Sequence, residues 1–170
     1  MPRHGNSPTI LLISGRKIKS SPCEMKAAII FPTVVAVAVI LFIPTGSGQV
    51  VPVAPRYHLH ILNGLSPNKI LLVHCQSKNN DLGVHNIPVN SEFEWSFRSN
   101  VWGTTLFWCY LAPDDHSHAD FNAFQDKEKI TDSCDGNGNC CWIAKDDGVY
   151  LRDFPKNSTD DLKYHWVAGT

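Results

Sequence analysis

Cysteine and histidine are the residue types in this sequence that could form disulfides, bind a metal ion or transfer protons. The six cysteines are Cys23, Cys75, Cys109, Cys134, Cys140 and Cys141. In an oxidising compartment such residues form disulfides, which stabilise small domains most. A structural zinc site is the alternative, but it favours C-x2-C spacing, whereas the last three cysteines here follow a C-x5-C-C pattern. The cysteine pattern therefore predicts disulfides and no metal ion.

Histidines and paired acids are the residues that could support catalysis. Histidines recur two positions apart at 58/60 and 116/118. Adjacent acids occur at 114–115, 146–147 and 160–161. Neighbouring side chains diverge on a strand or turn, and no spacing ties either histidine pair to a third ligand, so we expect solvent-exposed histidines and surface acids. A secreted hydrolase or ribonuclease that uses His58, His60, His74 or His116 for acid–base catalysis remains the alternative.

The charge distribution argues against a nucleic-acid partner. The whole chain has a formal net charge of −1, but five of its fifteen basic residues lie before position 27. From Gln49 onward, ten basic and fifteen acidic residues remain, a net charge of 10 − 15 = −5. An acidic surface without a basic stripe repels a phosphate backbone.

Residues 25–48 have the order of a secretory signal peptide. Lys26 precedes a mostly apolar run over 27–43, and Gly46 and Gly48 suit a cleavage site before Gln49. A membrane anchor is the alternative, but the run is shorter than the roughly 20 residues of a typical span and contains Pro32. We therefore expect a non-structural N-terminal extension over 1–24, a signal peptide over 25–48 and a domain over 49–170, without stable membrane insertion after cleavage.

The mature segment has the pattern of an all-β protein. Apolar and polar residues alternate over 57–61 and, with three aromatic side chains on one face, over 93–97. The stretch 104–111 has the composition of a strand, residues 142–151 form a candidate hairpin, and 81–83 is a candidate turn. No segment shows sustained 3.6-residue periodicity, so seven or eight short strands in a sandwich or barrel are expected.

Four strings carry a resemblance to a known family. They are His74-Cys75-Gln76-Ser77-Lys78-Asn79-Asn80-Asp81-Leu82-Gly83, Phe93-Glu94-Trp95-Ser96-Phe97, Thr104-Thr105-Leu106-Phe107-Trp108-Cys109, and Cys140-Cys141-Trp142 with Asp147-Gly148-Val149-Tyr150. In this order and spacing the chain resembles the plant self-incompatibility protein S1 family. The resemblance implies a secreted, extracellular antiparallel β-sandwich with two disulfides and no cofactor or enzymatic activity. It also implies a signalling ligand that a cell-surface receptor protein recognises, in pollen rejection or a related reproductive or developmental process.

The same resemblance assigns the disulfide-bonded cysteines. The family pattern Cys-x-Trp places Cys140 with Cys75, Cys109 and Cys134, and leaves Cys141 unpaired or bonded to another chain. Four cysteines allow three connectivities. The favoured one joins Cys75 to Cys140 and Cys109 to Cys134.

Polar loops are the expected receptor-binding surface, since loops on a rigid scaffold carry function. The two candidate loops cover 113–120 and 153–161, and the predicted contact residues are Asp114, Asp115, His116, His118, Asp153, Lys156, Asp160 and Asp161. Asn157-Ser158-Thr159 is a sequon, so Asn157 is a predicted glycosylation site. The expected form is a monomer, and a cell-wall protein that binds carbohydrate without turnover is a further alternative.

Overall fold

The computed structural model describes residues 21–23, 54–126, 128 and 130–169. Within these residues the chain forms ten β-strands and one short helix, α1 (Ile130–Ser133), arranged as two five-stranded sheets. The expected signal peptide at 25–48 lies outside the described residues. Of the expected N-terminal extension at 1–24, only residues 21–23 are described.

The first sheet, here called sheet A, places chain segments far apart in sequence side by side. Its strands in spatial order are β4 (Glu92–Arg98), β1 (Arg56–Asn63), β7 (Asn139–Lys145), β8 (Gly148–Asp153) and β9 (Thr159–His165). β1 pairs antiparallel with β4 but parallel with β7. A parallel pair needs a long crossover, which here contains β4, four strands of the second sheet and α1.

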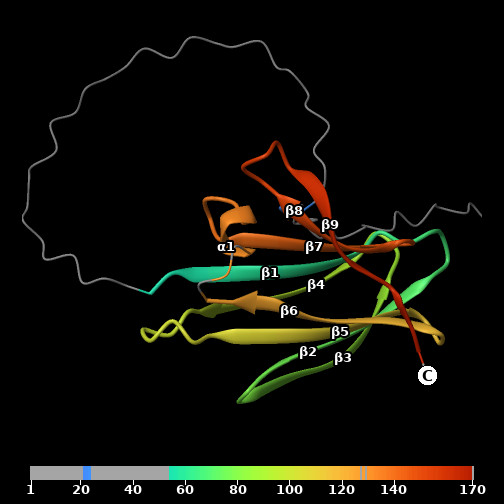
Figure 1. Cartoon of the computed structure of the whole chain (residues 1–170), viewed down its shortest axis with the longest axis horizontal. Coiled ribbons are helices and arrows are strands. Elements are labelled where there is room, and N and C mark those ends of the chain that lie inside the picture. The colour runs from blue at the N-terminus through green and yellow to red at the C-terminus, as the bar shows by residue number, and fades with distance from the viewer. Residues whose placement is uncertain (1–20, 24–53, 127, 129, 170) are drawn as a thin grey trace, which may run out of the picture.

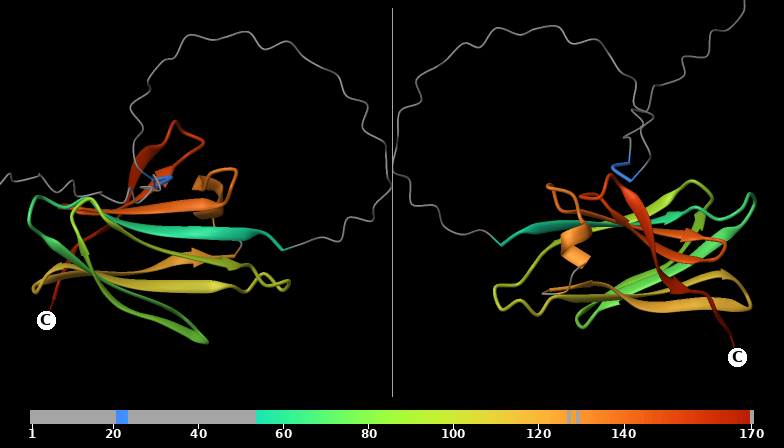
Figure 2. Two further views of the ribbon diagram at one scale, coloured as in Figure 1. Left: turned by 180° about the vertical axis from the view of Figure 1, so that it is seen from behind. Right: turned by 45° about the horizontal axis from the view of Figure 1, so that its top comes forward.

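The second sheet, sheet B, is antiparallel throughout. Its strands in spatial order are β10 (Val167–Ala168), β6 (Ser117–Gln125), β5 (Leu106–Asp114), β2 (Ile70–Ser77) and β3 (Asn80–Pro88). The two sheets face each other as the two layers of a sandwich (Figure 1), and the views from behind and with the top tilted forward show the same layering (Figure 2).

Aromatic side chains fill the space between the layers. Phe97 of β4 contacts Phe124 of β6, with ring centroids 4.8 Å apart, and Phe107 of β5, at 4.5 Å. Trp142 of β7 lies 4.7 Å from Phe121 of β6. The alternation that marked 93–97 in the sequence thus turns its three aromatic residues toward this core.

The structure confirms the all-β sandwich and corrects its details. Ten strands replace the seven or eight expected, because the polar strands β3 and β9 have little apolar alternation to reveal them. Residues 81–83, expected as a turn, lie inside β3, and the chain reverses at Lys78 and Asn79 instead. The parallel pairing of β1 with β7 also departs from the purely antiparallel expectation.

The favoured disulfide connectivity is wrong. The structure joins Cys75 to Cys109 and Cys134 to Cys140. Cys75 and Cys109 are direct partners on the neighbouring strands β2 and β5, with Cα atoms 4.1 Å apart. Cys75 and Cys140 lie on opposite sheets, so the nested pairing would require a bond across the core.

Candidate recognition surfaces

The first predicted contact loop forms the tight turn between β5 and β6. Asp114, Asp115 and His116 are exposed there. Asp114 accepts a hydrogen bond of 2.9 Å from the backbone N–H of His116, and this bond is the main reason that the pKa of Asp114 is lowered. His118 stacks on Tyr110, with ring centroids 5.5 Å apart. The turn is therefore a polar, internally bonded projection.

The second predicted loop, between β8 and β9, is only partly available for contacts. Lys156 is exposed and pairs with Asp153 at 2.9 Å, but Asp153 itself is buried. Asp160 binds Arg152 at 2.8 Å and Lys145 at 2.9 Å. Burial alone would raise the pKa of Asp160, but the hydrogen bonds from Arg152 and Lys145 outweigh burial and lower it. Asp153 and Asp160 therefore stabilise the hairpin rather than face a partner.

A pocket of about 540 Å³ opens beside this second loop. Its walls come from the segment around α1, from β7 to β9 and from the β8–β9 turn, and they include Glu128, Ile130, Trp142, Lys156, Asp161 and Tyr164. Asn157, the predicted glycosylation site, is exposed in the same turn. A sugar on Asn157 would therefore stand near the pocket.

The structure places the two predicted loops at opposite ends of the sandwich. The β5–β6 turn lies beside the C-terminal residues, where the N–H of Gly169 donates to the carbonyl of His116 over 2.6 Å. The β8–β9 turn lies beside α1, where the N–H of Phe154 donates to Ser133 over 3.1 Å. Because β6 runs from the first end to the second, the length of this nine-residue strand separates the two turns.

A third exposed element, which was not among the loops predicted from the sequence, is the loop 99–105 between β4 and β5, here called the Trp102 loop. Val101 and Trp102 at its tip are 85% and 80% exposed. Asn100 organises the loop, since its side-chain oxygen accepts hydrogen bonds from the N–H groups of Trp102 and Thr104 over 3.1 and 3.0 Å. The sequence signal that could have identified this loop is the apolar pair Val101-Trp102, followed by Gly103, between two expected strands.

Hydrogen bonds to Asp126, the residue that follows β6, anchor the base of the Trp102 loop. Asp126 accepts hydrogen bonds from the Ser99 hydroxyl and the Thr105 N–H, each over 2.8 Å. The loop lies at the same end of the sandwich as α1 and the β8–β9 turn. The N–H of Ser99 donates a hydrogen bond to the carbonyl of Pro55, just before β1, and β1 runs parallel to β7, which begins shortly after α1. A large apolar side chain is thus held in solvent by a hydrogen-bonded frame.

The histidines proposed for a hydrolase do not form one site. His58 and His60 lie on β1 in sheet A, His74 lies on β2 in sheet B, and His116 lies on the β5–β6 turn. His74 pairs with Asp81 of β3 over 2.8 Å. His60 is only 2% exposed, contrary to the expected solvent-facing position, because residues 21–23 and the neighbouring strands surround it.

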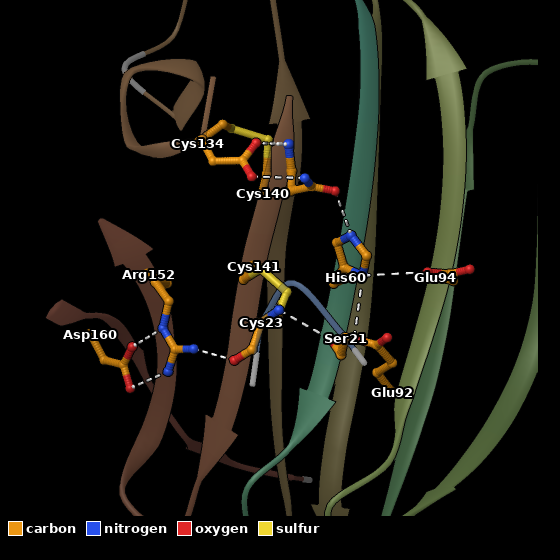
Figure 3. The surroundings of a disulfide bond; sticks show 12 residues. Ser21, Cys23, His60, Glu92, Glu94, Cys134, Cys140, Cys141, Arg152 and Asp160 are labelled. Atoms are coloured by element: carbon orange, nitrogen blue, oxygen red, sulfur yellow. Dashed lines mark hydrogen bonds and ion pairs between the residues drawn. A yellow bond between two sulfur atoms is a disulfide. The ribbon is translucent and has the colours of Figure 1, made fainter. Parts of the chain in front are cut away.

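Residues 21–23 lie against the outer face of sheet A, where Cys23 forms a disulfide with Cys141 of β7 (Figure 3). The Ser21 hydroxyl donates to Glu92 over 2.6 Å, and Arg152 donates to the carbonyl of Cys23. This arrangement corrects two expectations from the sequence, namely that residues 1–24 have no structure of their own and that Cys141 lacks an intrachain partner. Figure 2 shows the short segment, in blue, on that side of the molecule.

Comparison with known proteins identifies the family. The family model for plant self-incompatibility protein S1 matches residues 58–166, which is most of the described domain. The chain belongs to the plant self-incompatibility protein S1 family. This membership confirms the resemblance noted in the sequence.

Individual members of the S1 family are also similar to this chain. S-protein homolog 74 of Arabidopsis thaliana is 41% identical over 120 residues, which cover 71% of this chain and 78% of that protein. S-protein homolog 1 of the same plant is 36% identical over 120 residues, with the same coverage. Self-incompatibility protein S1 of Papaver rhoeas is 30% identical over 96 residues, which cover 56% of this chain and 68% of that protein.

One solved structure is similar to the described domain. It represents self-incompatibility protein homologues, described as a widespread family of small, highly stable, secreted plant proteins, and it matches with a TM-score of 0.48 and 18% identity over 69% of this chain and 97% of that chain. Among the residues that the structure describes, no helix is long and apolar enough to span a membrane.

Proposed function

We propose that this protein is a non-enzymatic extracellular ligand that a receptor protein at the surface of another cell recognises through its loops. The proposed role is self-incompatibility or a related reproductive or developmental signal. Membership of the S1 family and the similarity to self-incompatibility protein S1 of Papaver rhoeas support this class of function.

The observation that carries the proposal is the Trp102 loop. An exposed tryptophan on an ordered loop is suited to anchor a protein partner, because little conformational entropy is lost when an already ordered segment binds. Trp102 has this property, since hydrogen bonds through Asn100 order the backbone on both sides of it. Tryptophan is also among the residue types that contribute most to protein–protein affinity.

Charged residues at the same end of the sandwich extend this surface. Lys156 in the β8–β9 turn and Glu128 near α1 are exposed beside the pocket that opens there. A second pocket, of about 380 Å³, lies between the base of the Trp102 loop and the side chains of Gln125, Asp126 and Glu128. We infer that an apolar anchor with a polar rim binds the receptor, with the β5–β6 turn at the opposite end as a separate, secondary contact.

A binding assay with purified protein tests this proposal. The full coding sequence is expressed in plant cells, and the secreted product is labelled and added to plasma-membrane vesicles from pistil, pollen, root and seed. We expect saturable binding to at least one membrane, abolished by treating the vesicles with protease. The Trp102→Ala variant should bind roughly thirtyfold more weakly, which corresponds to about 2 kcal/mol for a central anchor.

A matched control removes exposed apolar side chains away from the loops. Ile70 and Val84 are 50% and 60% exposed on the neighbouring strands β2 and β3. The Ile70→Ser/Val84→Ser variant should keep the wild-type affinity. Equal loss in both variants, or binding that protease treatment of the vesicles leaves intact, would contradict a loop-borne receptor ligand, and turnover of RNA or glycan substrates would favour the hydrolase alternative.

A further inference from the structure

The strands of sheet B carry no lysine or arginine, which distinguishes this sheet from sheet A. Each strand of sheet A contains one lysine or arginine. The strands β2, β3, β5, β6 and β10 contain none, and their acidic residues are Asp81, Asp114 and Asp120. No other described element covers the outer face of sheet B (Figure 1). This face is therefore open and offers a polyanion no basic strand residue.

Two aromatic residues of β5 point outward on this face. Alternate residues of a strand point to opposite sides of the sheet, and Cys109, between Trp108 and Tyr110, belongs to the core. Trp108 and Tyr110 therefore point away from the core, and Tyr110 is 38% exposed. Their Cα atoms are two residues apart on one strand, about 7 Å, so the two side chains stand next to each other on the surface.

Polar side chains flank each of these aromatic residues on both neighbouring strands. Strand pairing creates two adjacent rows, here called the aromatic rows, that run from β2 across β5 to β6. The rows are His74, Tyr110 and Asp120, and Gln76, Trp108 and Asn122. Each row thus places an aromatic ring between two groups that can form hydrogen bonds.

Contacts within sheet B hold the first aromatic row in place. The ring of Tyr110 stacks on His118, with centroids 5.5 Å apart and planes inclined by 15°. Nε2 of His118 lies 3.7 Å from a carboxylate oxygen of Asp120, and His74 pairs with Asp81 over 2.8 Å. Because these contacts order the row before binding, a ligand that stacks on Tyr110 loses little side-chain entropy.

The aromatic rows also retain hydrogen-bonding capacity for a ligand. The side-chain amide of Gln76 has no hydrogen-bond partner among the residues that the structure describes. The amide nitrogen of Asn122 donates to Gln125 over 3.0 Å, which leaves the Asn122 oxygen as an acceptor. The side chain of Asp120 is 66% exposed. A ligand rich in hydroxyl groups, which both donate and accept hydrogen bonds, matches these groups.

We propose that the outer face of sheet B binds a neutral β-linked glucan chain, with sugar rings stacked on Trp108 and Tyr110. The hydroxyl groups of such a sugar ring are equatorial, so each face of the ring presents C–H groups. These C–H groups pack on the electron-rich faces of the aromatic rings, while the hydroxyl groups reach the polar side chains of the rows. This inference rests on the extracellular location in the proposed function but not on receptor binding.

Charge and composition favour this ligand over other extracellular polymers. An acidic polysaccharide would meet Asp120 without a lysine or arginine on any strand of the sheet. The centre of a protein–protein interface is depleted of charged residues, whereas polar side chains adjoin both aromatic residues here. A neutral polysaccharide satisfies both conditions.

The test uses the protein secreted by plant cells that express the full coding sequence. Co-sedimentation with insoluble cellulose and affinity electrophoresis in gels that contain xyloglucan measure binding to neutral glucans. Polygalacturonate is the acidic comparison. We expect binding to cellulose or xyloglucan and none to polygalacturonate. The affinity for the neutral glucan should stay constant as the NaCl concentration rises, because salt screens only interactions between charges.

Variants locate the binding site on sheet B. Tyr110→Ala should weaken glucan binding by about tenfold through loss of stacking, and Trp108→Ala should have a similar effect. Tyr110→Phe keeps the ring and should bind like the wild type. Trp102→Ala is the matched control, because it removes an exposed aromatic side chain from a different surface and should leave glucan binding unchanged. Circular dichroism establishes that each variant is folded.

Three results would overturn the proposal. The first is an equal loss of glucan binding in Trp102→Ala and Tyr110→Ala, which would indicate non-specific adsorption. The second is binding to polygalacturonate as strong as that to the neutral glucans. The third is no binding to cellulose or xyloglucan; a dimer that Tyr110→Ala dissociates in analytical ultracentrifugation would then identify the face as an interface between two copies of the chain. Failure to bind membrane vesicles would contradict the proposed receptor and leave these outcomes unchanged.

Discussion

Gly138 controls how the loop after α1 meets the start of β1. Its backbone has a φ of +80°, and a Cβ atom at this position would overlap the carbonyl oxygen of Arg56. The Gly138 carbonyl also accepts a hydrogen bond of 2.9 Å from the N–H of His58. Two features therefore disfavour a side chain at position 138: the left-handed backbone conformation and the close approach of β1.

Replacing Gly138 with alanine should destabilise the domain. We expect the Gly138→Ala variant to lose about 1–3 kcal/mol of unfolding free energy, as for other strained positions. Gly136→Ala in the same loop is the matched control, because a Cβ there meets no atom within 4 Å. Urea unfolding measures both variants, and an equal loss in the two would show that Gly138 is not constrained as described.

Among the elements, Asp146 joins two turns at one end of the sandwich. It lies in the β7–β8 turn and binds Lys69 over 2.8 Å and the N–H of Ser66 over 3.3 Å, both in the β1–β2 turn. The Ser66 hydroxyl donates to it as well. The hydrogen bond from Lys69, followed by those from Ser66, lowers the pKa of Asp146 from 3.8 to about 2.

This link predicts a dependence of stability on pH. A carboxylate whose pKa is lower in the folded state contributes stability above its unfolded pKa and loses that contribution as the pH falls through the folded pKa. Asp146 should therefore stabilise the protein above about pH 4 and lose this effect between about pH 4 and 2. In urea unfolding at several pH values, Asp146→Asn should be less stable than wild type at pH 6 and approach it at pH 2. A difference between the two proteins that does not change with pH would contradict the assignment.

At the scale of the whole molecule, aromatic packing and not sulfur joins the two layers. Cys75–Cys109 lies within sheet B, and Cys134–Cys140 closes the loop between α1 and β7. Trp142 of sheet A, in contrast, packs on Phe121 of sheet B and donates a hydrogen bond of 2.9 Å to the carbonyl of Ala123. The disulfides therefore restrict the unfolded chain, while the core orders the layers.

Two tryptophans give a direct comparison of core and surface. Trp142 is 1% exposed and Trp102 is 80% exposed. Trp142→Ala should cost about 3–5 kcal/mol, because it leaves a cavity between the sheets and removes the bond to Ala123. Trp102→Ala should change stability by no more than about 0.5 kcal/mol. Thermal and urea unfolding compare the variants, and a large loss for Trp102→Ala would show that the tip of its loop is structural.

The sequence by itself determined the class of fold and the family. Alternation of apolar and polar residues over 57–61 and 93–97 depends on local geometry, so the strands it predicts and the burial of their aromatic residues appear in the structure. The family strings likewise combine residues that lie near one another in sequence. Strands such as β3, whose polar residues carry no such alternation, could not be recognised in this way.

The tertiary structure decided which distant residues meet. The disulfide partners follow from strand order, since Cys75 and Cys109 face each other only because β2 pairs with β5. His60 is brought to Glu92 by the pairing of β1 with β4, and to Cys141 by the parallel pairing of β1 with β7. Spacing along the chain carries no information about such pairings, because the free energy that selects them comes from burying one common core.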